Sequence, residues 1–192
     1  MSSARRCGPA LALSLALVAS SCGSVGDEDP AEARLPGTGG PTTAPVSAGE
    51  VAAAPSAGCR GSPGAGAPSG EQTVAVRGDE RRYRRDLPPA HDGTTPVPLV
   101  VDLHGLSEGA AIHDRHTDLS GFGSRAGFVT VTPQGQGPVP LWTVDFDGAD
   151  VRFLTALLDA EEAALCIDTN RIFVTGLSNG AFLASAAACG TS

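Results

Sequence analysis

Few backbone conformations can accommodate the pentapeptide GLSNG, residues 176–180, which has the pattern G-x-S-x-G. An apolar run of strand length, residues 171–175, precedes it, and a run with helical composition, residues 181–188, follows it. This order predicts a sharp strand-to-helix turn in which the two glycines leave no room for side chains and Ser178 is strained and exposed. Ser178 is therefore a candidate nucleophile. The alternative is an ordinary glycine-containing turn with a capping serine.

A serine nucleophile needs a histidine base and an acid that orients it. Only 14 residues follow Ser178, and none of them is His, Asp or Glu. Where a serine is held on a turn of this kind, the acid and the base come later in the chain. We therefore expect a C-terminally truncated domain that turns over little or no ester by itself.

Acyl transfer also needs hydrogen-bond donors aimed at the developing oxyanion. One candidate is the backbone N–H of Asn179, directly after the serine and at the start of a helix. The second is the backbone N–H of Leu106, in the sequence LHGL that follows an apolar run; an ordinary turn is the alternative. Residues expected to support these groups are His104, Gly105, Gly176 and Gly180, with His104 holding the loop rather than transferring protons.

The second half of the chain alternates strands and helices. We predict strands at residues 73–76, 81–87, 99–103, 127–132 and 171–175, the first two as a candidate antiparallel pair across a Gly-Asp turn signal. Residues 108–126 are expected to form a loop and a helix, and residues 150–165 a helix capped by Asp150. This order predicts an α/β fold with a mostly parallel sheet and flanking helices.

The N-terminal part differs in composition. Residues 1–21 contain Arg5, Arg6, a short apolar run and small residues before Cys22, as in a lipoprotein signal peptide with Cys22 lipidated; a plain cleavable signal is the alternative. Of the residues 23–70, 33 of 48 are Gly, Pro, Ala or Ser, so we expect residues 22–70 to form a flexible linker. Residues 71–192 would then be the folded domain of an exported protein, either lipid-anchored to a membrane or extracellular.

Cys7 would leave with the signal peptide and Cys22 would carry the lipid, which leaves Cys59, Cys166 and Cys189. An exported protein is in an oxidising compartment, where disulfides persist. Cys166 and Cys189 follow two helices whose ends the intervening strand could bring together, so the predicted disulfide joins these two residues. Cys59 then has no partner in this chain, which agrees with a missing C-terminal part.

Charge and histidine spacing narrow the functional classes. The formal net charge of −8 argues against nucleic acid as a partner. The run RGDERRYRR, residues 77–85, is expected to form a solvated strand face. His113 and His116 could act as substitute bases or metal ligands, but neither the chain order nor the ligand spacing fits, so a solvated loop or helix face is preferred. We expect no metal and no cofactor.

Several segments of the folded part occur in an order that is typical of one enzyme family. They are RRYRRDLPP, PVPLVVDLHG, AGFVTVTPQGQG followed by Trp142, DVRFLTALLDA, and CIDTNRIFVTG, which continues into SNGAF. From about residue 81 to its end the chain thus resembles the polyhydroxybutyrate depolymerase and feruloyl esterase family of secreted α/β-hydrolases. The resemblance implies a carboxylic-ester hydrolase acting on a polyester or an aryl or acyl ester. It implies Ser178 as nucleophile, the amides of Leu106 and Asn179 as oxyanion hole, and an Asp and a His on later strands and loops.

Two hypotheses follow. In the first, the chain is the N-terminal part of an exported or lipid-anchored esterase. In the second, it is a surface-anchored binding or structural protein that keeps the turn without catalysis.

Overall fold

The computed structural model describes residues 51–59 and 67–190. The strands are β1 (Gly70–Val76), β2 (Asp79–Asp86), β3 (Val97–Leu103), β4 (Val129–Pro133) and β5 (Ile167–Gly176). The helices are α1 (Ala110–Thr117), α2 (Leu119–Ala126), α3 (Ala149–Ala164) and α4 (Asn179–Gly190). Every predicted strand and helix is thus present. The segment expected to hold a loop and one helix holds two short helices, which meet at Asp118 in a left-handed conformation (φ 49°).

The five strands form one mixed sheet in the order β1-β2-β4-β3-β5. Strand β3 is parallel to both β4 and β5, as the alternation of strands and helices predicts. Strand β2 is antiparallel to β1 and β4, so the candidate hairpin is confirmed. The turn between β1 and β2 has positive φ at both Arg77 (51°) and Gly78 (94°). Two-residue hairpin turns favour this conformation because its twist matches that of the flanking strands.

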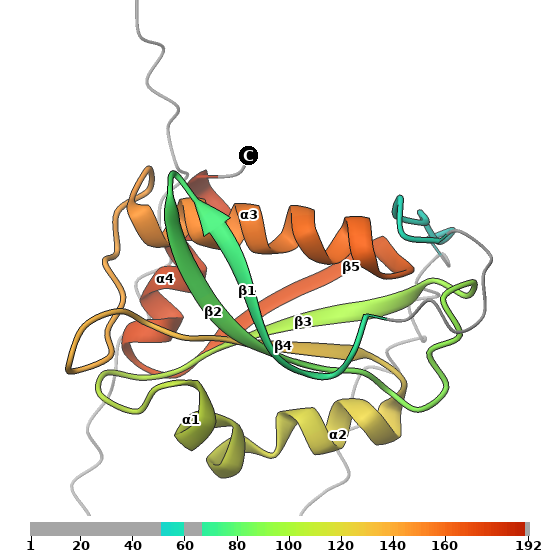
Figure 1. Ribbon diagram of the computed structural model, residues 1–192, viewed down its shortest axis with the longest axis horizontal. Coiled ribbons are helices and arrows are strands. Elements are labelled where there is room, and N and C mark those ends of the chain that lie inside the picture. The colour runs from blue at the N-terminus through green and yellow to red at the C-terminus, as the bar shows by residue number, and fades with distance from the viewer. Residues whose placement is uncertain (1–50, 60–66, 191–192) are drawn as a thin grey trace, which may run out of the picture. The chain divides into compact units, whose positions relative to one another are not determined.

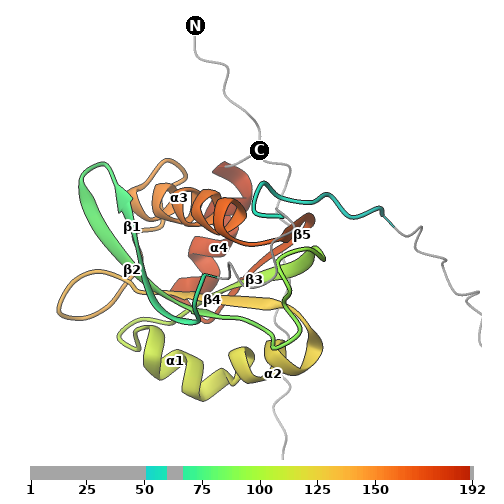
Figure 2. The ribbon, with the colours of Figure 1, turned by 45° about the vertical axis from the view of Figure 1, so that its right-hand side comes forward.

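Helices cover both faces of the sheet (Figure 1). Helices α3 and α4 lie on one face and α1 and α2 on the other, and the view turned by 45° shows the same layers (Figure 2). Strand β4 is buried at every position because both of its faces are covered. The largest fully buried apolar side chains come from β3, from helices α3 and α4, from the connection between α3 and β5, and from the start of β5: Leu99, Leu103, Phe153, Leu157, Leu165, Ile167 and Leu183.

The expected solvated face of β2 is instead the inner face of the hairpin. Arg81, Tyr83 and Arg85 alternate along the strand and are all buried against α3. The Arg85 guanidinium pairs with both carboxylate oxygens of Glu161, at 2.5 and 2.7 Å, and the Tyr83 hydroxyl donates to the same carboxylate at 2.6 Å. Burial, with the hydrogen bond to Glu161, raises the pKa of Tyr83, so its hydroxyl stays protonated as the donor.

Asp150 does not cap α3, contrary to prediction. The N-cap residue is Gly148, and the Asp150 carboxylate turns inward from the first helical turn. One of its oxygens accepts from the Arg81 guanidinium at 2.7 Å and the other from the Thr143 amide at 2.7 Å. The buried arginine takes this carboxylate because a charge inside the domain needs a partner more than a helix end needs a cap.

Residues 51–59 do not behave as part of a flexible linker. They lie against the start of β5, where Pro55 bridges Asp168 and the Ser56 hydroxyl donates to the Leu165 carbonyl at 2.6 Å. Cys59 is disulfide-bonded to Cys166, with 4.1 Å between their Cα atoms. The predicted Cys166–Cys189 disulfide is therefore wrong, because residues 51–59 place Cys59 beside Cys166 at the end of α3.

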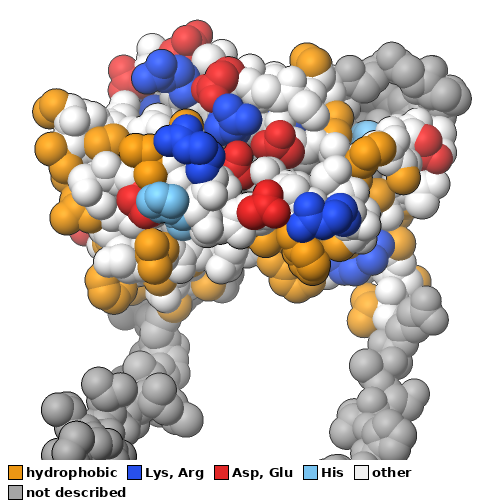
Figure 3. All heavy atoms as spheres, turned by 90° about the horizontal axis from the view of Figure 1, so that it is seen from below, with side chains coloured by type: hydrophobic (Ala, Val, Ile, Leu, Met, Phe, Trp, Pro, Cys, Tyr) orange, Lys and Arg blue, Asp and Glu red, His pale blue; other side chains and the backbone are white. Residues whose placement is uncertain are grey.

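The signal peptide at 1–21, lipidation at Cys22 and most of the linker at 22–70 lie outside the described residues. Within the described part, no helix is long and apolar enough to cross a membrane. On the face that α1 and α2 cover, acidic and basic side chains lie side by side and hydrophobic side chains gather along the margins (Figure 3).

Candidate active site

Three chain segments meet at one edge of the sheet because β3, β4 and β5 run parallel. They are the segment after β3 with the sequence HGL, the segment after β4 with the sequence QGQG, and the GLSNG turn after β5. In α/β sheets the carboxyl ends of parallel strands are the usual place for a ligand site. The predicted nucleophile, the predicted oxyanion-hole residues and the residues expected to support them all lie at this edge.

The GLSNG turn has the predicted strained geometry. Ser178 has a φ of 50°, a left-handed conformation that is uncommon for a residue with a side chain, and it is exposed. A Cβ added to Gly180 would lie 2.3 Å from the carbonyl oxygen of Leu103, and one added to Gly176 would lie 2.7 Å from the backbone of Gly180. Both positions therefore require glycine, because β5, α4 and the end of β3 are in direct backbone contact.

Among residues 51–59 and 67–190, the hydrogen bonds of the His104, His113 and His116 rings go to groups other than Ser178. The structure therefore brings no base to the serine from the described part of the chain.

The loop after β3 presents one backbone donor. The Gly105 amide donates to the Glu108 carboxylate at 3.1 Å, and the Ser107 amide donates to the Pro140 carbonyl at 2.8 Å. Between them, the amide of Leu106 makes no such hydrogen bond within the described residues. A Cβ added to Gly105 would lie 3.6 Å from the carbonyl oxygen of Leu177. This loop is therefore adjacent to the GLSNG turn.

His104 holds this loop from within the domain. Its ring is fully buried, Nδ1 donates to the Gly105 carbonyl at 2.7 Å, and Nε2 accepts from the Gly135 amide at 2.9 Å. These two bonds require a neutral imidazole with both nitrogens in use, so His104 cannot take a proton from a serine. Burial lowers the pKa of His104, and the protonated form is disfavoured for the same reason.

Trp142 connects the loop to the turn, a role that its lone position in the sequence did not reveal. Its indole N–H donates to the His104 carbonyl at 2.8 Å, and its ring lies 4.5 Å from the His104 ring between centroids. The Asn179 side chain accepts from the Trp142 amide at 2.8 Å and donates to its carbonyl at 3.2 Å. The Asn179 side chain therefore fixes the turn, and its backbone N–H, at the start of α4, remains the candidate donor.

His113 is not on a solvated helix face, contrary to prediction. Its ring is buried, with Nε2 3.0 Å from Asp102 and Nδ1 3.1 Å from Glu108. The same Glu108 oxygen accepts a hydrogen bond from the Gly105 amide. His113 and Glu108 therefore fix the conformation of the loop after β3. His116 is largely exposed and contacts the other oxygen of Glu108 at 3.2 Å. In the described part of the chain, no three potential ligand side chains are grouped as a metal site would need.

Because the His104 ring is buried in its neutral form, the stability of the domain is expected to depend on pH. The unfolded imidazole binds a proton at its ordinary pKa of about 6.5, whereas the folded one resists protonation. Its contribution to stability is therefore fully present above pH 6.5 and is lost as the pH falls below that value. The free energy of unfolding should decline there with a slope of up to about 1.4 kcal/mol per pH unit.

Urea unfolding at pH 7.5, 6.5 and 5.5 measures this slope. His104→Gln should remove this part of the slope, whatever its effect on stability at neutral pH. The matched comparison is the unchanged chain at the same three pH values. An unchanged slope in His104→Gln would contradict the assignment.

Comparison with known proteins supports an esterase relationship. No model of a known protein family matches the sequence. The chain is 31% identical over 152 residues to feruloyl esterase D of Neurospora crassa, covering 72% of this chain and 50% of that protein. It is 32% identical over 116 residues to probable feruloyl esterase C of Aspergillus terreus, covering 57% and 41%. The chain thus spans about half the length of these curated relatives.

Solved structures establish the fold. Acetyl xylan esterase from Aspergillus awamori matches with a TM-score of 0.55 at 17% identity, over 63% of this chain and 47% of that one. The native structure of a protein designated sOPH matches with a TM-score of 0.54 at 18% identity, over 64% and 47%. The described domain has the α/β-hydrolase fold, and its sequence is similar to that of feruloyl esterases.

Proposed function

We propose that this chain provides the nucleophile and the oxyanion hole of a serine carboxylic-ester hydrolase. The observation that carries the proposal is the strained, exposed Ser178 on a turn that two obligatory glycines press against the end of β3. In the proposed reaction, Ser178 Oγ attacks the ester carbonyl carbon while a base takes the hydroxyl proton. The backbone N–H groups of Leu106 and Asn179 stabilise the negative oxygen that forms, and the alcohol leaves with the proton that the base returns. Water then hydrolyses the acyl-serine and releases the acid.

The base and the acid of this reaction have to be supplied. None of the residues that follow Ser178 in the printed sequence is a histidine or an acid, and the nearest buried histidines, His104 and His113, are engaged elsewhere. We therefore expect the 192-residue chain alone to show little or no steady-state turnover. Removal of all three members of such a triad costs about 2 × 10⁶ in kcat in a well-studied protease.

The proposed substrate is an aryl or acyl ester, as the names of the relatives suggest, or a polyester. The covalent chemistry of a serine needs no cofactor. We further propose that the protein is exported and that Cys22 carries a lipid that anchors it to a membrane. Nothing in the described domain favours nucleic acid as a partner over an ester, given the mixed charges of its α1 and α2 face.

The test uses an activated ester and an external base. p-Nitrophenyl acetate needs no acid to expel its leaving group, and dissolved imidazole can replace the missing histidine. With imidazole, the chain should release p-nitrophenolate roughly tenfold or more faster than Ser178→Ala, because only the unchanged chain has a hydroxyl beside the oxyanion donors for the external base to activate.

The matched control is Ser185→Ala, on the exposed side of the same helix α4, which should behave as the unchanged chain. Equal release by the chain and by Ser178→Ala would favour the second hypothesis, a binding or structural protein. Rapid turnover without imidazole, lost in Ser178→Ala, would instead overturn the statement that the base has to be supplied.

A further inference from the structure

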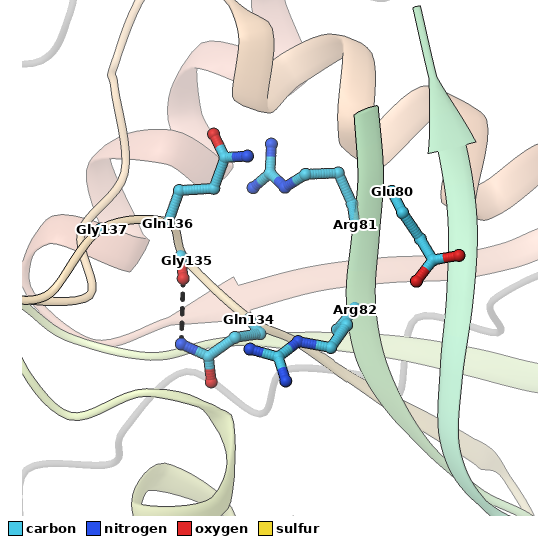
Figure 4. A pocket seen from close by; sticks show the side chains of 7 residues that line it. All are labelled: Glu80, Arg81, Arg82, Gln134, Gly135, Gln136 and Gly137. Atoms are coloured by element: carbon cyan, nitrogen blue, oxygen red, sulfur yellow. Dashed lines mark hydrogen bonds between the residues drawn. The ribbon is translucent and has the colours of Figure 1, made fainter. Parts of the chain in front are cut away.

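A pocket of about 240 Å³ opens between β2 and the segment that follows β4 (Figure 4). The pairing of these strands ends at Tyr83 and Pro133, and the last link is the Gln134 amide, which donates to the Arg82 carbonyl at 3.0 Å. Beyond this point the two segments diverge. The pocket is therefore a fork in the sheet, lined by Glu80, Arg81, Arg82, Gln134, Gly135, Gln136 and Gly137.

The fork lies at the same edge of the sheet as Ser178. Gly135, which lines it, donates its amide to His104, the residue that holds the proposed oxyanion loop. Strand β4 is separated from β5 only by β3, and neighbouring strands are about 4.8 Å apart. The fork, between β2 and β4, is therefore two to three strand spacings from the GLSNG turn, about 10–14 Å along the edge and within reach of one extended substrate.

Hydrogen-bond donors dominate the fork. Arg81 and Gln136 face each other on one side, Arg82 and Gln134 face each other on the other, and the Glu80 carboxylate points away from all four (Figure 4). The side-chain amide of Gln134 is held in place. Its oxygen accepts from the backbone N–H of Ala110, and its nitrogen donates to the Gly135 carbonyl.

The charged groups of the fork are not all paired with one another. Arg81 is buried and paired with Asp150 at 2.7 Å, so its charge is compensated. The guanidinium of Arg82 is exposed and makes no hydrogen bond or ion pair with any side chain that the structure describes. The Arg82 guanidinium thus lies beside Gln134, while the Glu80 carboxylate, which also lines the fork, points away from it (Figure 4). A guanidinium in this position can bind a carboxylate in a planar, two-bond geometry.

We propose that this fork binds a carboxylate-bearing, hydroxylated unit, a sugar acid. Arg82 pairs with the carboxylate, and Gln134 and Gln136 hydrogen-bond the hydroxyl groups. A neutral sugar would leave the Arg82 charge unmatched, so the site discriminates by charge. The sugar acid would form the alcohol part of the ester that Ser178 attacks, and this part of the proposal rests on the proposed function. The binding of the sugar acid does not rest on it.

The experiment measures binding of glucuronate to the full chain by calorimetry, with glucose as the neutral match. Glucuronate should bind at least about tenfold more tightly than glucose, and Arg82→Gln should remove about tenfold of its affinity, as expected for one charged hydrogen-bonded pair. The control is Arg84→Gln, two residues along the same face of β2 but paired with Glu71 outside the fork, and it should bind as the unchanged chain.

Equal affinity for glucuronate and glucose, equal effects of the two arginine changes, or no measurable binding would each overturn the proposal. Arg82 is exposed, so Arg82→Gln should fold, and its thermal midpoint verifies this. Ser178→Ala should bind glucuronate as the unchanged chain does. Failure of the acylation test therefore leaves the binding result standing, and failure of the binding test leaves the proposed hydrolysis standing.

Discussion

Replacing Glu161 with glutamine is expected to destabilise the domain by about 3–5 kcal/mol. Glutamine keeps the shape and can still accept from Tyr83, but it removes the only charge that faces the Arg85 guanidinium in the described structure. The two side chains are 4% and 0% exposed, so solvent cannot take over the lost interaction. The uncompensated buried charge accounts for most of the cost. Urea unfolding at pH 7.5 measures it.

The control for this change is the next residue on α3. Glu162→Gln removes the same charge from a partly exposed position without an ion pair among the described residues and should change stability by at most about 0.5 kcal/mol. The triple change Glu161→Leu, Arg85→Met and Tyr83→Phe should recover much of the loss, because it leaves no charge unpaired and no buried hydroxyl without an acceptor. Equal stability of Glu161→Gln and Glu162→Gln would contradict the buried pair.

Breaking the Cys59–Cys166 disulfide is expected to cost about 2–5 kcal/mol. The bond closes a loop between residues 107 apart in sequence, so it restricts the unfolded chain strongly. It also holds residues 51–59 against the start of β5, the strand that carries Ser178 at its other end. Unfolding with and without a reducing agent measures the cost.

In Cys59→Ser the reducing agent should have no further effect, because the bond is already absent. In Cys189→Ser it should lower stability as in the unchanged chain. A response to reductant that depended on Cys189 and not on Cys59 would contradict the pairing seen in the structure.

The GLSNG turn could be predicted from the sequence because its constraints are local. A strand, a glycine at each side and a helix within a few residues permit one tight turn, and the positive φ of Ser178 follows from that turn. The loop after β3 was predicted for a similar reason, since parallel strands end at the same edge. The catalytic roles of Leu106 and Asn179 stay predictions.

The buried charges could not be assigned in advance, although the sequence holds a signal for them. Arg81 and Arg85 lie four residues apart on one face of a strand, about 13 Å, and Asp150 and Glu161 lie eleven residues apart on one face of a helix, about 16 Å. The two spacings match closely enough for both pairs to form. Nothing in the sequence says which helix faces which strand, and that packing decides whether the arginines are buried or solvated.

The disulfide was missed for a related reason. Cys59 lies in a segment rich in Gly, Pro, Ala and Ser, which predicts disorder. The segment is ordered at residues 51–59 through bonds to residues more than 100 positions away, such as that from Ser56 to Leu165. The supports of the loop after β3 were also hidden, because Trp142 and His113 reach it from the segment after β4 and from α1.

The most direct test of the account is to locate the acyl group. After incubation with p-nitrophenyl acetate and imidazole, the chain should carry one acetyl group, and peptide mass spectrometry should place it on Ser178. Ser185→Ala should give the same result, and Ser178→Ala should carry none. Acetylation spread over other serines, or undiminished in Ser178→Ala, would contradict the claim that this turn presents a nucleophile.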